Sequence, residues 1–279
     1  MTVFAGQGDP RRSVELLWRT GGPERRRGAP GPRPGLSLDL IVDTAIAVAD
    51  AEGLAALSMR AVGERLGRSA MALYTYVPGK AELLDLMYDR ALAELPAGYD
   101  TGPGWRPALR AWAVDTRDFH VRHPWSLEVS PARPVLGPNE HAAMEALVRL
   151  LESCGLPAPV LRRVVGTLLH FVRGAARAIA DARAATAATG TDEREWWLAR
   201  MAVIGEAAPD FAERFPALLR VSTAEQGAEP SPEAREAGAA PPEGASYLEA
   251  EARRTFDTGL GILLDGIAAA VPPDSRAGP

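Results

Sequence analysis

Cysteine, lysine and long apolar runs are scarce in this chain of 279 residues. Its single cysteine, Cys154, excludes an internal disulfide framework and any cysteine-rich metal site. No run approaches the roughly 20 apolar residues of a membrane-spanning helix. The N-terminus also lacks the charged and then apolar pattern of a signal peptide. We therefore expect a cytoplasmic protein with no membrane partner, in which Cys154 is a quiet thiol.

Recognisable catalytic and metal-binding patterns are missing as well. The chain has no nucleophile beside a base and no paired acids in a credible frame, and Gly102-x-Gly104 lacks the preceding strand of a phosphate-binding loop. His120 and His123 lie three residues apart, and His141 or His170 could approach them. Histidines before a proline are commonly helix C-terminal caps, however, and no carboxylate pair completes a metal site. We expect no enzymatic activity, no cofactor and no metal.

Acidic residues outnumber basic ones by 36 to 31, which gives a net charge of −5. Proteins that coat nucleic acid everywhere are usually strongly basic, so any DNA contact here must be local. Arginines gather among glycine and proline within residues 1–35. This segment is expected to be a mostly disordered arm that lies along phosphates or enters a minor groove. The alternative is a solvated tail with Trp18 docked on the body.

Helical periodicity runs through the rest of the chain, and no strand alternation or internal repeat appears. Residues 222–245, rich in Pro, Glu, Ala and Gly, have little to bury and predict a flexible loop. We therefore predict an all-α fold with a small domain over residues 36–95 and a larger helical domain over 104–271. Helices are expected at 38–53, 58–66, 69–77, 80–95, 105–122, 139–153, 158–185, 191–205 and 246–271.

Residues 58–80, SMRAVGERLGRSAMALYTYVPGK, follow the plan of a helix-turn-helix. Ser58 can cap the first helix, Gly67 supplies the turn, and Pro78-Gly79 ends the second helix. Apolar residues recur at helical spacing on both sides of the turn: Met59, Val62 and Leu66, then Ala70, Leu73 and Val77. The other faces of the second helix are therefore free to enter a major groove.

The longer stretch GLAALSMRAVGERLGRSAMALYTYVPGKAELLDLM resembles the DNA-binding head of the TetR family of transcriptional repressors. The runs Ala72-Leu73-Tyr74 and Tyr76-Val77, followed by Lys80, carry the resemblance, which covers residues 36–95. Two positions depart from the family pattern. Gly63 replaces the usual alanine and weakens its helix by about 1 kcal/mol, and Arg68, in place of a small apolar residue, either adds a contact or is solvated.

The resemblance implies which residues contact phosphates and base edges of double-stranded DNA. They are Arg60, Ser69, Ala70, Met71, Ala72, Tyr74, Thr75, Tyr76 and Lys80, and Arg68, which departs from the family pattern, is a further candidate. Lys80 is the only lysine in the chain. In the first turn of a helix, its ammonium would join backbone N–H groups and the positive end of the dipole, which suits a phosphate oxygen. The alternative is a solvated surface lysine.

A second implication of the resemblance is a homodimer on a near-palindromic operator, because a two-fold DNA site requires a two-fold protein. Residues 160–185 and 247–271 are the candidates for a four-helix dimer interface. Gly174 and other small residues allow close approach in the first helix, and Leu260 contributes to an apolar face on the second. The alternative is that these faces belong to the core of each subunit.

The resemblance also implies a pocket for a small-molecule effector. The many aromatic and aliphatic residues within 105–201, with few paired charges among them, predict a mostly apolar effector, for example aromatic or polyketide-like, held by one or two histidine hydrogen bonds. Aromatic stripes are more often core than ligand wall, so this alternative stays open for each residue. The candidate lining residues are Trp112, Phe119, His120, His123, Trp125, Met144, Leu147, Leu151, His170, Phe171, Trp197 and Met201. We expect a ligand-responsive repressor. An activator or a constitutive DNA binder is the alternative, whereas a helical protein adaptor would leave the helix-turn-helix unexplained.

Overall fold

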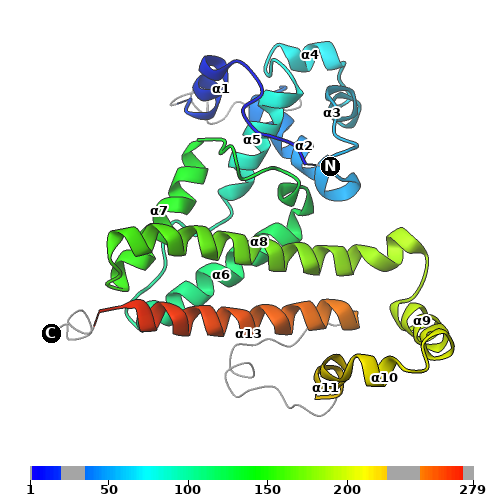
Figure 1. Cartoon of the computed structure of the whole chain (residues 1–279). Helices are drawn as coiled ribbons and strands as arrows, with labels where there is room; N and C mark the ends of the chain where they lie inside the picture. The colour runs from blue at the N-terminus through cyan, green and yellow to red at the C-terminus, as the bar shows by residue number, and fades with distance from the viewer. Residues whose placement is uncertain (1, 20–34, 225–245, 273–279) are drawn as a thin grey trace. The chain divides into compact units, whose positions relative to one another are not determined.

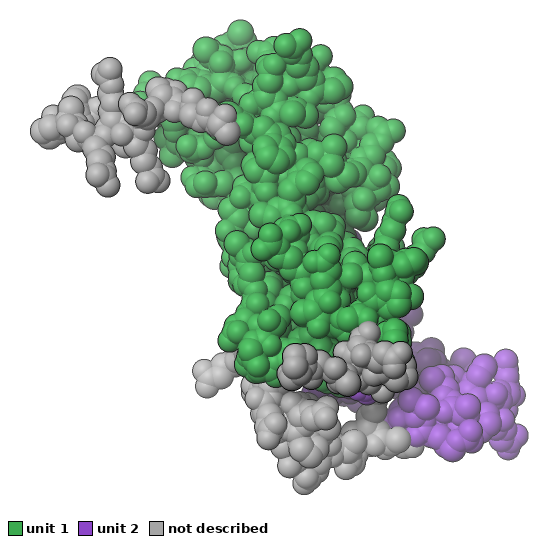
Figure 2. All heavy atoms as spheres, turned by 90° about the vertical axis from the view of Figure 1, so that its left-hand side faces the viewer, with its two compact units in different colours: residues 1–176, 266–279 green, residues 177–265 purple. Residues whose placement is uncertain are grey.

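The computed structural model describes residues 2–19, 35–224 and 246–272, and it confirms the all-α prediction (Figure 1). The only pairing of strand type within these ranges is an isolated bridge between Val3 and Val129. The chain forms two compact units, one of residues 1–176 and 266–279 and the other of residues 177–265 (Figure 2). Among the residues described, no helix is long and apolar enough to cross a membrane.

The helices follow one another without intervening strands. The first unit contains α1 (Pro10–Leu17), α2 (Leu38–Glu52), α3 (Met59–Leu66), α4 (Ala70–Tyr74), α5 (Lys80–Leu92), α6 (Trp105–Arg122), the 3₁₀ helix η1 (Pro124–Leu127) and α7 (Pro138–Ser153). The second contains α9 (Glu193–Ala207), α10 (Phe211–Arg214) and α11 (Pro216–Ala224). Two long helices contribute residues to both units: α8 (Ala158–Thr189) and α13 (Tyr247–Ala270).

Capping signals in the sequence set where the helices of the N-terminal bundle, α2 to α5, begin and end. Ser37, Ser58 and Ser69 each accept the backbone N–H three residues ahead through the side-chain oxygen, at 3.1, 3.1 and 3.4 Å. Gly67 ends α3 with a φ of 63°, in the left-handed region that favours glycine. The predicted helix-turn-helix is therefore present, with its first helix and turn at the predicted residues. The second helix, α4, ends at Tyr74, before the predicted end at residue 77 and before Pro78-Gly79.

A single apolar cluster fills this bundle and continues into the C-terminal part of the first unit. Leu73 and Val77, from the second half of the helix-turn-helix, are fully buried in it. Phe119 of α6 and Trp125 of η1 belong to the same cluster. Packing between the N-terminal bundle and the start of the C-terminal domain is thus continuous.

Most predicted helices of the C-terminal domain are confirmed, with ends that shift by a few residues. The first, α6, has the predicted bounds, whereas α8 continues to Thr189 instead of ending at 185. Helices α10 and α11 were not predicted, and α11 includes residues 222–224 of the expected flexible loop. The rest of that expected loop, residues 225–245, lies outside the described residues.

The expectation of a mostly disordered arm over residues 1–35 is wrong for residues 2–19. Helix α1 forms there because Asp9 accepts the Arg12 N–H at 2.9 Å and Pro10 occupies the first helical position. The Trp18 indole N–H donates to the Leu136 carbonyl at 2.8 Å, as in the alternative of a docked tryptophan. Residues 20–34, which hold several of the arginines, lie outside the described residues.

Candidate DNA-binding surface and effector region

The exposed side of α4 carries the side chains that the sequence predicts for base contacts. Leu73 at its back is fully buried, while Met71, Tyr74 and Tyr76 are 73%, 43% and 38% exposed. Among the ten predicted DNA-contact residues, only two, both alanines of α4, are half-buried, and the others are exposed. A short helix is thus anchored by one face and presents an apolar and aromatic face to solvent.

Gly63 allows the turn between α3 and α4 to fold close to α3. Its carbonyl accepts the Arg68 N–H at 2.8 Å. A Cβ at residue 63 would lie 2.7 Å from the Arg68 carbonyl oxygen and 3.3 Å from the Ala70 nitrogen, both of them backbone atoms that cannot easily move. Gly63 is therefore expected to weaken α3 relative to alanine, but it also allows the start of α4 to lie closer to α3 than alanine would.

Three basic residues border α4, and they differ in their partners. The Arg60 guanidinium is 2.8 Å from Glu64 one turn further along α3, and both side chains are exposed. Arg68 and Lys80 are exposed, and the described part of the chain offers neither of them an ion pair. Lys80 opens α5, whose N-terminal N–H groups receive no side-chain cap. This end of α5 combines an ammonium with uncapped amides, an arrangement suited to an anion.

Asp50 on α2 connects the N-terminal bundle to the predicted effector region. Its Oδ1 accepts the indole N–H of Trp125 at 2.7 Å and lies 2.7 Å from Nδ1 of His123. The other ring nitrogen of His123 is 3.2 Å from Glu94, which also accepts from Arg122 at 2.8 Å. Since His123 is 4% exposed and Trp125 1%, both side chains are structural links between the two domains in this conformation.

His120, the second histidine at the end of α6, is also buried and bonded. Its Nδ1 is 2.7 Å from the Ser126 hydroxyl, and its ring meets the Phe119 ring edge-on with centroids 5.1 Å apart. Burial, together with the positive charge of Arg173, lowers the His120 pKa to about 3. The imidazole is therefore neutral at physiological pH. No group of three or more potential metal ligands lies together in the ranges described.

The other predicted lining residues are divided between core and surface. Trp112 of α6 and Leu147 and Leu151 of α7 are buried, whereas Met144 of α7 is 39% exposed. On α8, His170 is exposed and Phe171 half-buried, and the second unit exposes Trp197 and Met201 on α9. Packing favours the core interpretation for the buried residues.

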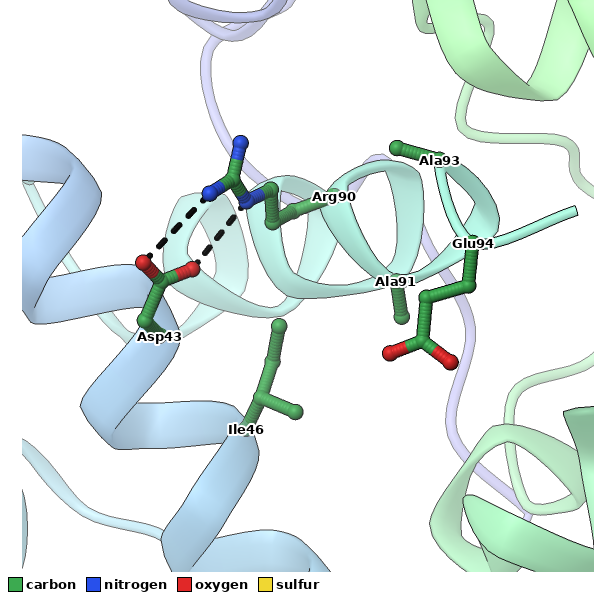
Figure 3. Close-up of a pocket in the computed structure, with 6 residues that line it drawn as sticks. All are labelled: Asp43, Ile46, Arg90, Ala91, Ala93 and Glu94. Carbon is green, nitrogen blue, oxygen red and sulfur yellow. Dashed lines mark hydrogen bonds and ion pairs between the residues drawn. The ribbon is translucent and has the colours of Figure 1, made fainter.

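A surface hollow of about 320 Å³ lies between α2 and α5 (Figure 3). None of the predicted effector-binding residues borders it. The Arg90 guanidinium spans its edge and donates to both carboxylate oxygens of Asp43, at 3.0 and 3.4 Å. Its lining residues are Asp43, Ile46, Arg90, Ala91, Ala93 and Glu94.

Two buried carboxylates of α5 hold neighbouring segments, and the sequence did not single them out. Oδ1 of Asp89 accepts the N–H groups of Asn139 and Glu140 at the start of α7, both at 2.9 Å. Asp85 accepts the Gly6 N–H at 3.0 Å. Burial raises the pKa of both carboxyl groups, which the hydrogen bonds only partly offset. No local motif reveals these roles, because each partner lies at least 50 residues away.

Two family descriptions match this chain along most of its length. Residues 41–87 match bacterial regulatory proteins of the tetR family, and residues 97–271 match the tetracyclin repressor-like C-terminal domain. The first of these segments contains α3 and α4 with the exposed face of the helix-turn-helix.

Individual proteins show the same likeness. The HTH-type transcriptional repressor DrrR1 of Streptomyces coeruleorubidus is 42% identical over 223 residues, 79% of this chain and 80% of that protein. The crystal structure of apo ActR from Streptomyces coelicolor has a TM-score of 0.61 at 25% identity, covering 85% of this chain and 99% of that one. ActR in complex with actinorhodin gives 0.62 at 26%, with 87% and 100% covered. The chain therefore belongs to the TetR family of bacterial transcriptional regulators and carries its DNA-binding helix-turn-helix.

Proposed function

We propose that this protein is a dimeric repressor that binds a near-palindromic operator and leaves it when a small hydrophobic effector binds the C-terminal domain. The observation that carries the proposal is α4, which is anchored by fully buried Leu73 and presents Met71 and Tyr74 to solvent, with exposed Tyr76 two residues beyond its end. The curated relative of 42% identity is named a repressor, which supports repression over activation.

The division of labour on the DNA follows from side-chain chemistry. Arg68 and Lys80 are cations without an intramolecular ion pair among the described residues, so they suit phosphate contacts that position the protein. Met71 can contact a thymine methyl group, and the Thr75 hydroxyl can bond to a base edge. Arg60 would exchange Glu64 for a phosphate, at small cost because exposed ion pairs contribute about 0–1 kcal/mol.

The homodimer proposal rests on the two-fold symmetry of the operator and on the long helices α8 and α13. Phe256, Leu260 and Leu264 of α13 are fully buried, so the core interpretation holds for them. On other faces of these helices, Val160 and Ile262 are 37% and 67% exposed. Gly174 has open space where a Cβ would point, so a second helix could approach α8 closely there.

The effector proposal rests on the fold and on the many apolar and aromatic side chains of the C-terminal domain. ActR, which shares this fold, binds actinorhodin. A constitutive DNA binder is the second candidate, favoured by one observation: both ring nitrogens of His123 and Nδ1 of His120 already have partners within the protein, namely Asp50, Glu94 and Ser126. For an effector to act, it must bind the state with low DNA affinity more tightly than the other state.

Thermal unfolding combined with operator binding tests the effector proposal. Actinorhodin and a panel of other hydrophobic metabolites are the probes. A ligand that favours the DNA-free state a hundredfold shifts the operator equilibrium by about 2.7 kcal/mol, so it should raise Tm and release operator fragments together. Compounds that raise Tm but never change operator affinity would support the constitutive binder instead.

A further inference from the structure

The N-terminal segment of residues 2–19 precedes the family match, which begins at residue 41, yet it is packed into the first unit. Ala5 and Leu17 are 1% and 7% exposed and belong to the main apolar cluster. Helix α1 packs against α5, the helix that follows the helix-turn-helix. The segment is therefore an ordered part of the domain that carries α4.

Both ends of this segment hold the loop between α6 and α7. Near the start, Val3 donates its N–H to the Glu128 carbonyl at 2.9 Å and accepts the Ser130 N–H at 2.8 Å. Near the end, the Trp18 indole donates to the Leu136 carbonyl at 2.8 Å and meets the His141 ring edge-on. The loop is thus held at two places six to eight residues apart, at residues 128–130 and at Leu136.

The middle of the segment holds α5. The Gly6 N–H donates to buried Asp85 at 3.0 Å, and Gly6 adopts a φ of 65° that favours glycine. Gly8 lies so close to Glu82 that a Cβ there would overlap the Glu82 carboxylate. Beyond α1, Arg19 forms an ion pair with Asp39 on α2. One segment therefore contacts two helices of the DNA-binding bundle and a loop of the C-terminal domain.

The same loop is held from its other side by α8. The Arg173 guanidinium donates to the carbonyls of Leu127 and Val129, at 3.2 and 2.9 Å. These carbonyls flank the Glu128 carbonyl that accepts from Val3. A continuous hydrogen-bonded path thus leads from α8 through residues 127–130 and the N-terminal segment to Asp85 on α5.

We propose that residues 2–19 form a brace that couples α8 to α5, so that a displacement of the 127–130 loop is transmitted to the DNA-binding bundle. Val3, which bonds to the loop, and Gly6, which bonds to α5, are only three residues apart. The loop therefore cannot move far without either displacing α5 or breaking one of these hydrogen bonds. The contribution of the brace to operator control rests on the proposed function, whereas the physical coupling does not.

Hydrogen exchange on the full chain tests whether the hydrogen bonds that hold the brace are formed in solution. The amides of Val3 and Ser130 donate to backbone carbonyls and that of Gly6 to the Asp85 carboxylate, so all three should exchange at least about tenfold more slowly than in an unstructured chain. Exchange of residues 2–19 at the unstructured rate would overturn the proposal.

Arg173→Met tests the coupling, with Arg177→Met as the matched control. Arg173 touches the loop but not the brace, whereas Arg177, one turn further along α8, pairs with Asp181. Exchange at residues 2–19 should therefore rise several-fold in Arg173→Met and stay unchanged in the control. Because Arg173 also contacts the Tyr88 side chain of α5 directly, Tyr88→Phe is a second control that removes this contact alone and should leave exchange at residues 2–19 unchanged. Equal behaviour of Arg173→Met and either control would overturn the coupling.

Trp18→Phe is the milder variant if the Arg173 substitution unfolds the chain. It keeps an aromatic ring but removes the donor to Leu136 and part of the ring surface, so exchange at the brace should again rise, while Arg11→Ala on the exposed side of α1 should change nothing. Unchanged exchange in Trp18→Phe would overturn the proposal.

Operator binding tests the functional part of the proposal. Trp18→Phe should change operator affinity, whereas Arg11→Ala should not. If the natural chain binds no operator fragment, the proposed function fails while the exchange data still decide the brace.

Discussion

The α4 surface and the end of α6 are both rich in aromatic and polar side chains, but they use them in opposite ways. Met71 and Tyr74 stand in solvent beside cations that have no intramolecular ion pair in the described chain. Phe119, His120 and Trp125 are turned inward, and His120 Nδ1 and the Trp125 indole N–H are hydrogen-bonded within the protein.

This difference shows that the side chains available for DNA recognition and those that stabilise the fold are in separate regions. Exposed groups keep their bonding capacity for a partner, since water can be exchanged for a phosphate or a base edge. Buried polar groups must be paired within the fold, because an unpaired one costs about 1–3 kcal/mol. The Asp50 junction with His123 and Trp125 therefore fixes the two domains to each other in the conformation described.

Phe119→Ala should give the largest effect and tests the contrast directly. Removing a fully buried ring from a packed cluster should lower the free energy of unfolding by about 3–5 kcal/mol. Met71→Ala, at 73% exposure, should stay within about 0.5 kcal/mol while weakening operator binding. Denaturant unfolding at fixed protein concentration measures both. A loss below about 1 kcal/mol for Phe119→Ala would mean that the ring lines an open pocket.

Acid should destabilise the fold through His120. In the unfolded chain this imidazole takes up a proton below about pH 6.5, whereas the folded chain keeps it neutral down to about pH 3. Its contribution is therefore fully present above pH 6.5 and is lost as the pH falls through that window, at about 1.4 kcal/mol per pH unit. Burial raises the pKa of Asp85 and Asp89, so these carboxyl groups act in the opposite direction.

The variant His120→Asn separates these contributions, since it retains a polar atom near Ser126 but does not titrate in this range. Stability against denaturant, measured between pH 7 and 4, should fall less steeply in this variant than in the natural chain. Parallel curves would show that His120 is accessible to protons in the folded state.

Asp50→Ala should have an intermediate effect. It leaves the indole N–H of Trp125 and one nitrogen of His123 without their shared acceptor, which should cost about 1–3 kcal/mol of unfolding free energy. Asp43→Ala, on the same helix, removes an exposed ion pair with Arg90 and should cost at most about 1 kcal/mol. Equal losses in the two variants would show that the junction is not buried in solution.

Much of the α4 surface was predictable, because its signals are local. Ser58, Gly67 and Ser69 act on neighbours within four or five residues, and a helical period identifies Leu73 as the buried anchor. Local signals were also present at α1, where Asp9 caps the helix and a proline occupies its first position, but the prediction of a disordered arm overlooked them. The docking of α1 depends on partners far along the chain, which the local sequence does not reveal.

The end of α6 was predictable as a helix end but not as a site. His123 does end α6, as expected for a histidine before proline. Its partners Asp50 and Glu94 lie 73 and 29 residues earlier, and nothing in the local sequence marks them. Trp125 is buried and donates to Asp50, whereas Trp197 is exposed. Composition alone could not distinguish these two candidates, because long-range hydrogen bonds decide which of them is structural.

Lys80→Ala should give the smallest effect, and it sharpens the recognition side of the comparison. A single phosphate contact carries no base information, so operator and unrelated DNA should lose affinity alike. The slope of log affinity against log salt should fall by about one unit. Thr75→Ala should instead change which half-site is preferred. An unchanged salt slope in Lys80→Ala would contradict the phosphate role.

Selection of genomic fragments by the purified full chain, followed by footprinting, tests the central claim most directly. A dimer that reads DNA with the exposed face of α4 should enrich a near-palindromic site with half-sites about 34–36 Å apart or somewhat more. Met71→Ala combined with Thr75→Ala should abolish the enrichment without unfolding the protein. A chain that stays monomeric at micromolar concentration and enriches no fragment would contradict the account.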